Sequence, residues 1–188
     1  MNIYPLNSTQ EDMLRESNLE TMENGFQVTV FFEISAHRLS ADEMAAACQE
    51  FLDINHYAHV HLVRQEDGQL MISESTDMPN NVHRYKMKHS EWEARQSEFA
   101  RPFKLLEEPG VRLNVIETEQ KTVVCYSFCH IFFDGISIKL VCSAIDNVVN
   151  GVPIEDQDDI AAVWNREEIA SYESEIYQRT KQTVCEKF

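Results

Sequence analysis

Apolar and polar residues alternate along several parts of the chain with the two-residue period of a β-strand. Residues 27–35 show this alternation, with one face made of Val28, Val30, Phe32 and Ile34. Residues 58–64 and 69–74 flank the turn sequence Glu66-Asp67-Gly68, which predicts a β-hairpin. Residues 122–129 form a β-branched and aromatic run, and a second hairpin is predicted over residues 111–129.

Other apolar residues recur at helical spacing, and capping signals precede two of these stretches. Ser40 and Glu43 form a capping box before a predicted helix that buries Met44, Cys48, Phe51 and Leu52. Ser90 and Glu93 give the same signal before a helix carrying Trp92 and Phe99. A third helix is predicted from Ile138, Val141, Cys142, Ile145, Val148 and Val149, and it ends at Asn150-Gly151.

These elements predict an α+β fold. Hairpin connections favour a mixed or mainly antiparallel sheet over a βαβ repeat, so we expect a two-layer sandwich with helices on one face. The length of 188 residues suits one domain, and 43% hydrophobic residues suffice for one core. Residues 158–188 also carry apolar residues at helical spacing, which predicts a terminal helix.

The charge and cysteine content exclude several classes of protein. A formal net charge of −16 would repel phosphates, so no nucleic acid and no anionic membrane surface is expected as a partner. The five cysteines, an odd number, favour reduced thiols over a disulfide framework. There is neither a signal-like start nor an apolar run of ~18 residues. We therefore expect a cytoplasmic protein.

The segment Cys129-His130-Ile131-Phe132-Phe133-Asp134-Gly135 carries the clearest chemical signal. A histidine leaving an apolar strand can reach into a cleft, where a neutral imidazole can accept a proton from an amine or a hydroxyl. Asp134 would fix the loop by accepting N–H groups or by pairing with an arginine.

Several nearby residues are expected to fix the shape of the segment that carries His130. Arg101 and Arg112 are candidate salt-bridge partners for Asp134, and Ser137 would cap the following helix or face the site. Gly135 is expected in a turn too crowded for a side chain. Cys129 is interpreted as a packing residue, because neighbouring strand residues point to opposite faces and its thiol should not meet the imidazole.

A second group of histidines comprises His56, His59 and His61. His59 and His61 would share one strand face, a spacing at which two imidazoles can share a metal. A structural zinc site needs four ligands, however, and no other Cys or His pair has the sequence spacing of zinc ligands. We therefore predict no metal site, and we keep His56 as a candidate substrate-lining residue.

Three segments together resemble the N-terminal lobe of a condensation domain of nonribosomal peptide synthetases. They are residues 4–14, residues 101–105 followed by 111–113, and the histidine segment at 129–137. The family patterns are Y-P-L-(S/T)-x-x-Q, R-P-F-x-L and H-H-x-x-x-D-G-x-S. The residues that match them are Gln10, Arg101, Phe103, His130, Asp134, Gly135 and Ser137.

The sequence departs from the family at two places. Cys129 stands where the family usually has its first histidine, whereas the second histidine, which is held to act in catalysis, is present as His130. The family's R-H-x-x-L-R-T segment appears as residues 55–61 and keeps only one position. This second departure bears on the lining of the site and on substrate preference.

The resemblance implies a chloramphenicol-acetyltransferase-like lobe spanning residues 1–188, with the C-terminal half of the domain absent. The implied reaction joins two thioesters by an amide bond, with His130 placing or deprotonating the attacking amine. The substrates would arrive on phosphopantetheine arms of carrier proteins, so no cofactor would bind directly. The implied partners are the carrier proteins and the missing lobe, and the isolated lobe should show little or no activity.

Two other functions fit the same residues. The first is a coenzyme A-dependent acyltransferase that completes its site by self-association. The second is a non-catalytic lobe that docks carrier proteins, which the loss of the first histidine favours. A docking surface for an acidic carrier would need a basic patch, for which the candidates are Arg84, Lys86 and Lys88.

Overall fold

The computed structural model describes residues 3–17, 26–35, 39–74, 78, 80–152, 170 and 174. The helices are α1 (Ser8–Glu16), α2 (Ala41–Ile54), η1, a 3₁₀ helix (His56–His59), α3 (His89–Phe99) and α4 (Gly135–Val149). The strands are β1 (Ile3–Pro5), β2 (Gln27–Ser35), β3 (His61–Arg64), β4 (Leu70–Ser73), β5 (His83–Lys86), β6 (Val111–Glu117) and β7 (Lys121–Cys129). The predicted helix over residues 158–188 lies almost wholly outside the described residues.

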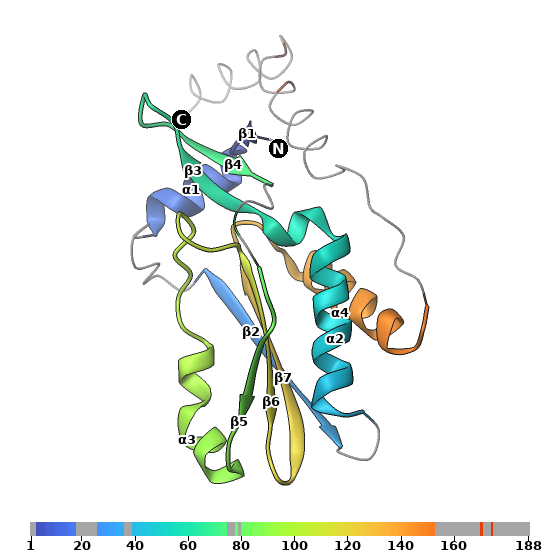
Figure 1. The fold of residues 1–188 in the computed structure, drawn as a ribbon. Coiled ribbons are helices and arrows are strands. Elements are labelled where there is room, and N and C mark those ends of the chain that lie inside the picture. Colours follow the sequence, from blue (N-terminus) through green and yellow to red (C-terminus); the bar gives the residue numbers. More distant parts are fainter. Residues whose placement is uncertain are drawn as a thin grey trace, which may run out of the picture.

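The strands form two sheets, in the orders β2-β7-β6-β5 and β1-β4-β3. In the larger sheet β5 runs parallel to β6, and the other two pairings are antiparallel. The smaller sheet is antiparallel and lies beyond one end of the larger one (Figure 1). The prediction of an α+β fold with a mixed, mainly antiparallel sheet is therefore confirmed.

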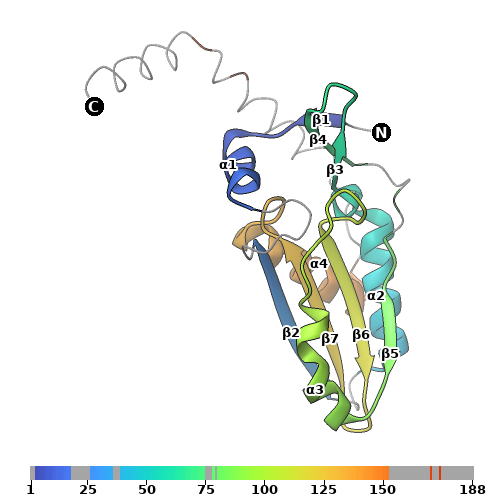
Figure 2. The ribbon, with the colours of Figure 1, turned by 90° about the vertical axis from the view of Figure 1, so that its left-hand side faces the viewer.

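Helices cover both faces of the larger sheet. The α2 and α4 helices pack on one face, and α3 packs on the other (Figure 2). Our expectation of helices on one face thus holds only for α2 and α4. The reason lies in the central strands, which are apolar at successive positions: Val115 and Val124 face α2 and α4, whereas Ile116 and Val123 join Trp92 under α3.

The two capping signals had different outcomes. Ser40 and Glu43 form the predicted capping box of α2, with bonds in both directions. The prediction that Ser90 caps α3 is wrong, because the N-cap lies two residues earlier, at Lys88, and makes no side-chain cap bond. A tertiary contact fixes this start: the His89 N–H donates to the Glu119 carboxylate in the β6–β7 turn, 2.9 Å away.

The β3–β4 hairpin forms as predicted, with Gly68 at a φ of +89° in the turn. Its first strand begins later than expected, because residues 56–59 form η1. The Asn55 side chain starts η1 by accepting the Tyr57 N–H at 3.0 Å. Among the described helices none is both long and apolar enough to cross a membrane.

Candidate active site

Strand β7 ends at the end of the larger sheet nearest the smaller sheet (Figure 1), and His130 is the next residue of the chain. Its backbone N–H donates to the Phe26 carbonyl at 2.7 Å, which extends the β2–β7 pairing by one residue. The His130 side chain is exposed, whereas Cys129 before it and residues 131–133 after it are buried. The imidazole is therefore exposed to solvent, while the residues before and after it are packed in the core.

The loop after His130 is held by its own backbone and by Tyr57. The N–H groups of Phe132 and Phe133 both donate to the Cys129 carbonyl at 3.0 Å, which closes a tight turn. The Tyr57 hydroxyl donates to the Phe132 carbonyl at 3.1 Å, and its ring meets Phe133 edge-on at 5.4 Å. Burial raises the pKa of Tyr57, so the hydroxyl remains a proton donor at neutral pH.

Gln10 connects this loop to α1. Its side chain is buried, and Nε2 donates to the Ile131 carbonyl at 3.1 Å. Its Oε1 accepts the Asn7 N–H at 3.0 Å while Asn7 caps the helix in return. A residue that matched the family pattern in the sequence thus orients the segment that carries His130.

Gly110 makes the close approach that the sequence led us to expect at Gly135. A Cβ atom on Gly110 would lie 2.4 Å from Cδ2 of Phe132, a distance at which the ring must move. The Gly110 carbonyl also accepts a hydrogen bond from the Cys129 N–H, and the Gly110 N–H donates to the Val60 carbonyl, both at 2.7 Å. Sequence reasoning missed this residue, and only its position just before a predicted strand could have drawn attention to it.

The expectation of a crowded turn at Gly135 is wrong. This residue is exposed, and a Cβ atom there would meet nothing within 4 Å. Gly135 is the first residue of α4 and lies on its solvent side. The lobe itself would therefore accept a small side chain at this position.

Asp134 is the N-cap of α4. One of its oxygens, Oδ1, accepts the Ser137 N–H and the Ser137 hydroxyl, each at 2.7 Å. The Ser137 hydroxyl bond and then its N–H bond hold the pKa of Asp134 below its ordinary value, and proximity to His130 acts in the same direction. The carboxylate therefore fixes the start of α4 directly after the histidine loop.

Arg101 and Arg112 interact with Glu108 and not with Asp134. Arg101 makes two 2.7 Å bonds to the Glu108 carboxylate. Arg112 points to the α3 face of the sheet, where its guanidinium lies 4.2 Å from the centre of the Phe103 ring. The suggested pairing with Asp134 is therefore corrected, because the turn at residues 104–108 brings a nearer carboxylate.

Burial raises the pKa of the Cys129 thiol to about 12. The thiol is therefore protonated at neutral pH and is a poor nucleophile. It packs in the core while the His130 side chain is exposed, in line with opposite orientations of the two neighbours. The four described cysteines are all free thiols.

His56, His59 and His61 do not form a shared site. His59 lies in η1, so it does not share a strand face with His61 as we expected. The His59 ring contacts the Leu52 carbonyl and the His61 ring contacts the His59 carbonyl, each at 2.9 Å. His56 is exposed on η1. Within the described residues, no three His, Cys, Asp or Glu side chains are grouped as metal ligands would be.

Most of the suggested basic patch is paired with acidic groups. Arg84 forms an ion pair with Asp42, and Lys86 forms one with Glu117 at 2.6 Å. Lys88 lies just before α3. Arg84 and Lys86 are therefore less available to bind an acidic partner than the sequence suggested.

Comparison with known proteins agrees with this arrangement. The family model described as condensation domain matches residues 1–168. Surfactin synthase subunit 1 of Bacillus subtilis (strain 168) is 22% identical over 183 residues, which cover 95% of this chain and 5% of that protein.

Solved structures share the fold. The condensation domain of the monacolin K polyketide synthase MokA superposes with a TM-score of 0.74 at 12% identity, covering 92% of this chain and 40% of that one. The cyclization-docking bidomain of EpoB from Sorangium cellulosum gives a TM-score of 0.73 at 15% identity, covering 98% of this chain and 38% of that one. The chain thus spans less than half the length of these relatives.

Proposed function

This chain belongs to the condensation-domain family, and we propose that residues 1–188 supply the N-terminal lobe of a domain that joins two carrier-bound thioesters by an amide bond. His130 would be its catalytic residue. The observation that carries the proposal is the exposed imidazole on a loop fixed by Phe26, Tyr57 and Gln10. Because these contacts fix the backbone of residues 130–132, the imidazole starts from a defined place when it meets a substrate.

In the proposed reaction the nitrogen of an acceptor aminoacyl thioester bonds to the carbonyl carbon of a donor acyl thioester. The proton that the nitrogen loses passes to an imidazole nitrogen of His130. The carbonyl–sulfur bond then breaks, and the departing thiolate takes a proton as the amide forms. Both thioesters would be carried on phosphopantetheine arms of carrier proteins, which are substrates here and not bound cofactors. His130 thus acts through placement and proton acceptance.

The start of α4 supports the proposal that a second lobe covers this site. Ile136 and Leu140, one helical turn apart, are 71% and 57% exposed directly after the histidine loop. Large apolar side chains grouped on a surface favour a covering partner. The C-terminal lobe of the same domain would be that partner, so we expect the single lobe to show little or no condensation activity.

The test is His130→Ala in a two-lobed protein that contains this chain, assayed with one loaded donor carrier and one loaded acceptor carrier. Amide product, measured by mass spectrometry, should fall by about 10²–10⁴-fold, the usual contribution of a positioned acid or base. The thermal midpoint should remain unchanged because the side chain is exposed. His83→Ala is the matched control, since His83 is an exposed histidine on the edge strand β5 of the larger sheet.

Product formation that survives in His130→Ala would refute the catalytic assignment. Carrier binding without any product in the unmodified two-lobed protein would instead favour the non-catalytic docking lobe. Acetyl transfer from acetyl-coenzyme A by a trimer of this chain alone would favour the self-associating acyltransferase.

A further inference from the structure

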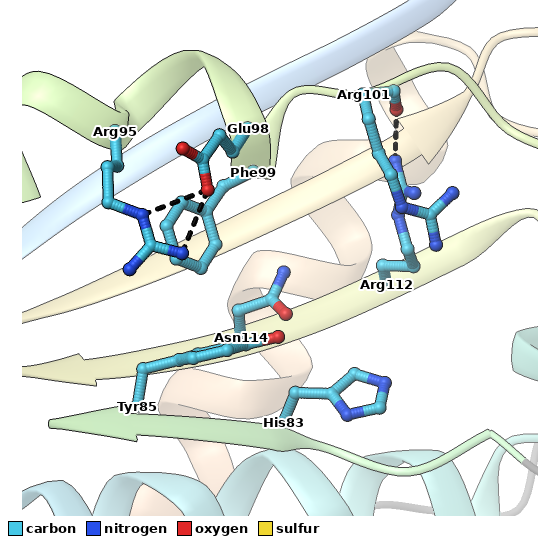
Figure 3. A pocket seen from close by; sticks show the side chains of 8 residues that line it. All are labelled: His83, Tyr85, Arg95, Glu98, Phe99, Arg101, Arg112 and Asn114. Carbon is cyan, nitrogen blue, oxygen red and sulfur yellow. Dashed lines mark hydrogen bonds and ion pairs between the residues drawn. The ribbon is translucent and has the colours of Figure 1, made fainter.

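A pocket of about 300 Å³ lies on the α3 face of the larger sheet (Figure 3). The walls come from α3 and the segment after it, from β5 and from β6. The residues that line it are His83, Tyr85, Arg95, Glu98, Phe99, Arg101, Arg112 and Asn114. A water molecule occupies roughly 30 Å³ in the liquid, so this pocket is too large for one or two waters alone.

Arg112 is the unusual residue of this pocket. Its side chain is only 8% exposed, and Nη2 donates to the Arg101 carbonyl. Nε and Nη1 are buried and have no hydrogen-bond acceptor among the described residues. The nearest carboxylate oxygen, Oε2 of Glu108, is 3.6 Å from Nη1, which is an ion-pair distance but too long for a hydrogen bond. A buried guanidinium with two unsatisfied nitrogens is rare in proteins and requires an explanation.

The neighbouring carboxylates are already used by other cations. Glu108 accepts two 2.7 Å bonds from Arg101 and the Lys104 N–H at 2.8 Å. Glu98, the acidic residue in the lining, accepts from Arg95 at 2.9 Å. Arg101 and Arg112 share one carboxylate, Glu108, so positive charge is in excess at their end of the pocket, whereas Arg95 at the other end pairs with both Glu91 and Glu98. In a chain of net charge −16, this is a local site where an anion would be favoured.

We propose that this pocket binds an oxyanion, a carboxylate or a phosphate, beside the guanidinium groups of Arg101 and Arg112. Guanidinium groups bind these two anions better than other ligands because their N–H groups match the oxygen spacing. The Phe99 and Tyr85 rings, which meet edge-on at 5.0 Å, supply an apolar wall for the remainder of an organic acid. This site is independent of the function proposed for His130.

The test follows thermal unfolding of the full chain in sodium acetate, sodium benzoate or sodium phosphate, against sodium chloride at equal ionic strength. At one hundred times the dissociation constant we expect the midpoint to rise by about 5–10 °C. Arg112→Met should remove this saturable rise. Arg15→Met is the matched control, because Arg15 is an exposed arginine paired with Asp12 on α1 and should keep the full rise.

Phosphate also stabilises proteins without binding a site, and Arg112→Met replaces a buried side chain, so a second measurement uses the unmodified chain. The Nε–H signal of Arg112 in ¹⁵N-edited spectra should shift saturably with the anion, whereas that of Arg15 should not. A larger effect of benzoate identifies an organic carboxylate, and a larger effect of phosphate identifies a phosphate ligand. Equal midpoint rises in all variants, with no saturable Nε–H shift, would show that the pocket holds only water and would overturn the proposal.

Discussion

At the scale of single residues, the candidate site depends on contacts around His130 more than on contacts of His130 itself. Its side chain is exposed, and the atoms that fix its place belong to Phe26, Gln10 and Tyr57. Each of these contacts uses a backbone group of residues 130–132. The position of His130 is therefore set by residues distant in the sequence, and its side chain remains available for the proposed chemistry.

Gly110 provides a direct test of the idea that packed neighbours set the position of His130. We expect Gly110→Ala to lower the free energy of unfolding by about 1–3 kcal/mol, the usual cost of overpacking, because the new methyl group would overlap the Phe132 ring. Urea denaturation measures the loss, and the backbone amide shifts of residues 130–133 should change with it.

Gly135→Ala is the matched control for this change, since its methyl group would meet open space. We expect its stability and loop shifts to stay close to those of the unmodified chain. If both alanine variants behaved alike, the close approach between Gly110 and Phe132 would not be the feature that positions the loop.

At the scale of elements, α4 begins at the histidine loop because Asp134 caps it. The two bonds from Ser137 satisfy one free N–H of the first turn and hold the carboxylate in its charged form. The helix then runs without interruption to Val149, and Asn150 and Gly151 end it. The cap therefore fixes the register of the helix relative to His130.

We expect Asp134→Ala to cost about 0.5–2 kcal/mol of stability, the range for losing an N-cap side chain, and Asp134→Asn to cost less. Because the folded-state pKa is lowered, the charged cap stabilises the fold above the ordinary aspartate pKa and this contribution is lost as pH falls through the folded value. The difference between the unmodified chain and Asp134→Asn should therefore shrink below about pH 4. Thermal unfolding between pH 7 and pH 2.5 measures it.

Asp146→Ala is the control on the same helix, because Asp146 is exposed near its far end. A stability loss at Asp146 equal to that at Asp134 would point to a general effect of charge on α4 and against a specific cap.

At the scale of the whole molecule, the chain spans about 40% of the solved condensation-domain chains whose fold it shares. The smaller sheet and η1 meet the end of the larger sheet at residues 105–110, where β3 and Val60 bond to the segment before β6. The histidine loop emerges at this junction. The site is therefore built where three parts of the fold converge.

The exposed apolar residues at the start of α4 give a prediction at this scale. We expect the double variant Ile136→Ser, Leu140→Ser to leave the stability of the single lobe almost unchanged, since both side chains are largely exposed. In a two-lobed protein the same change should lower both the thermal midpoint and product formation. Lys139→Ser, on the exposed side of the same turn, is the control. An unchanged two-lobed protein would contradict coverage of this surface by the second lobe.

The sequence determined the elements that depend on short-range patterns. Strand β2, the hairpin of β6 and β7, and the cap and apolar face of α2 lie where alternation, helical spacing and capping residues placed them. It also identified the histidine segment and its resemblance to the condensation family, because those residues stand in order within short windows. These features arise from interactions between neighbours along the chain.

Tertiary structure alone decided how these parts meet. It placed α3 on the second face of the sheet, started that helix through Glu119, and brought Gly110 against Phe132. It also paired Arg101 with Glu108 and left two buried nitrogens of Arg112, a residue that lines a pocket, without hydrogen-bond acceptors. Each outcome depends on the distance between residues that are separated in the sequence or on which of several charges lies nearest. Local patterns do not contain that information, because packing of the complete core sets these distances.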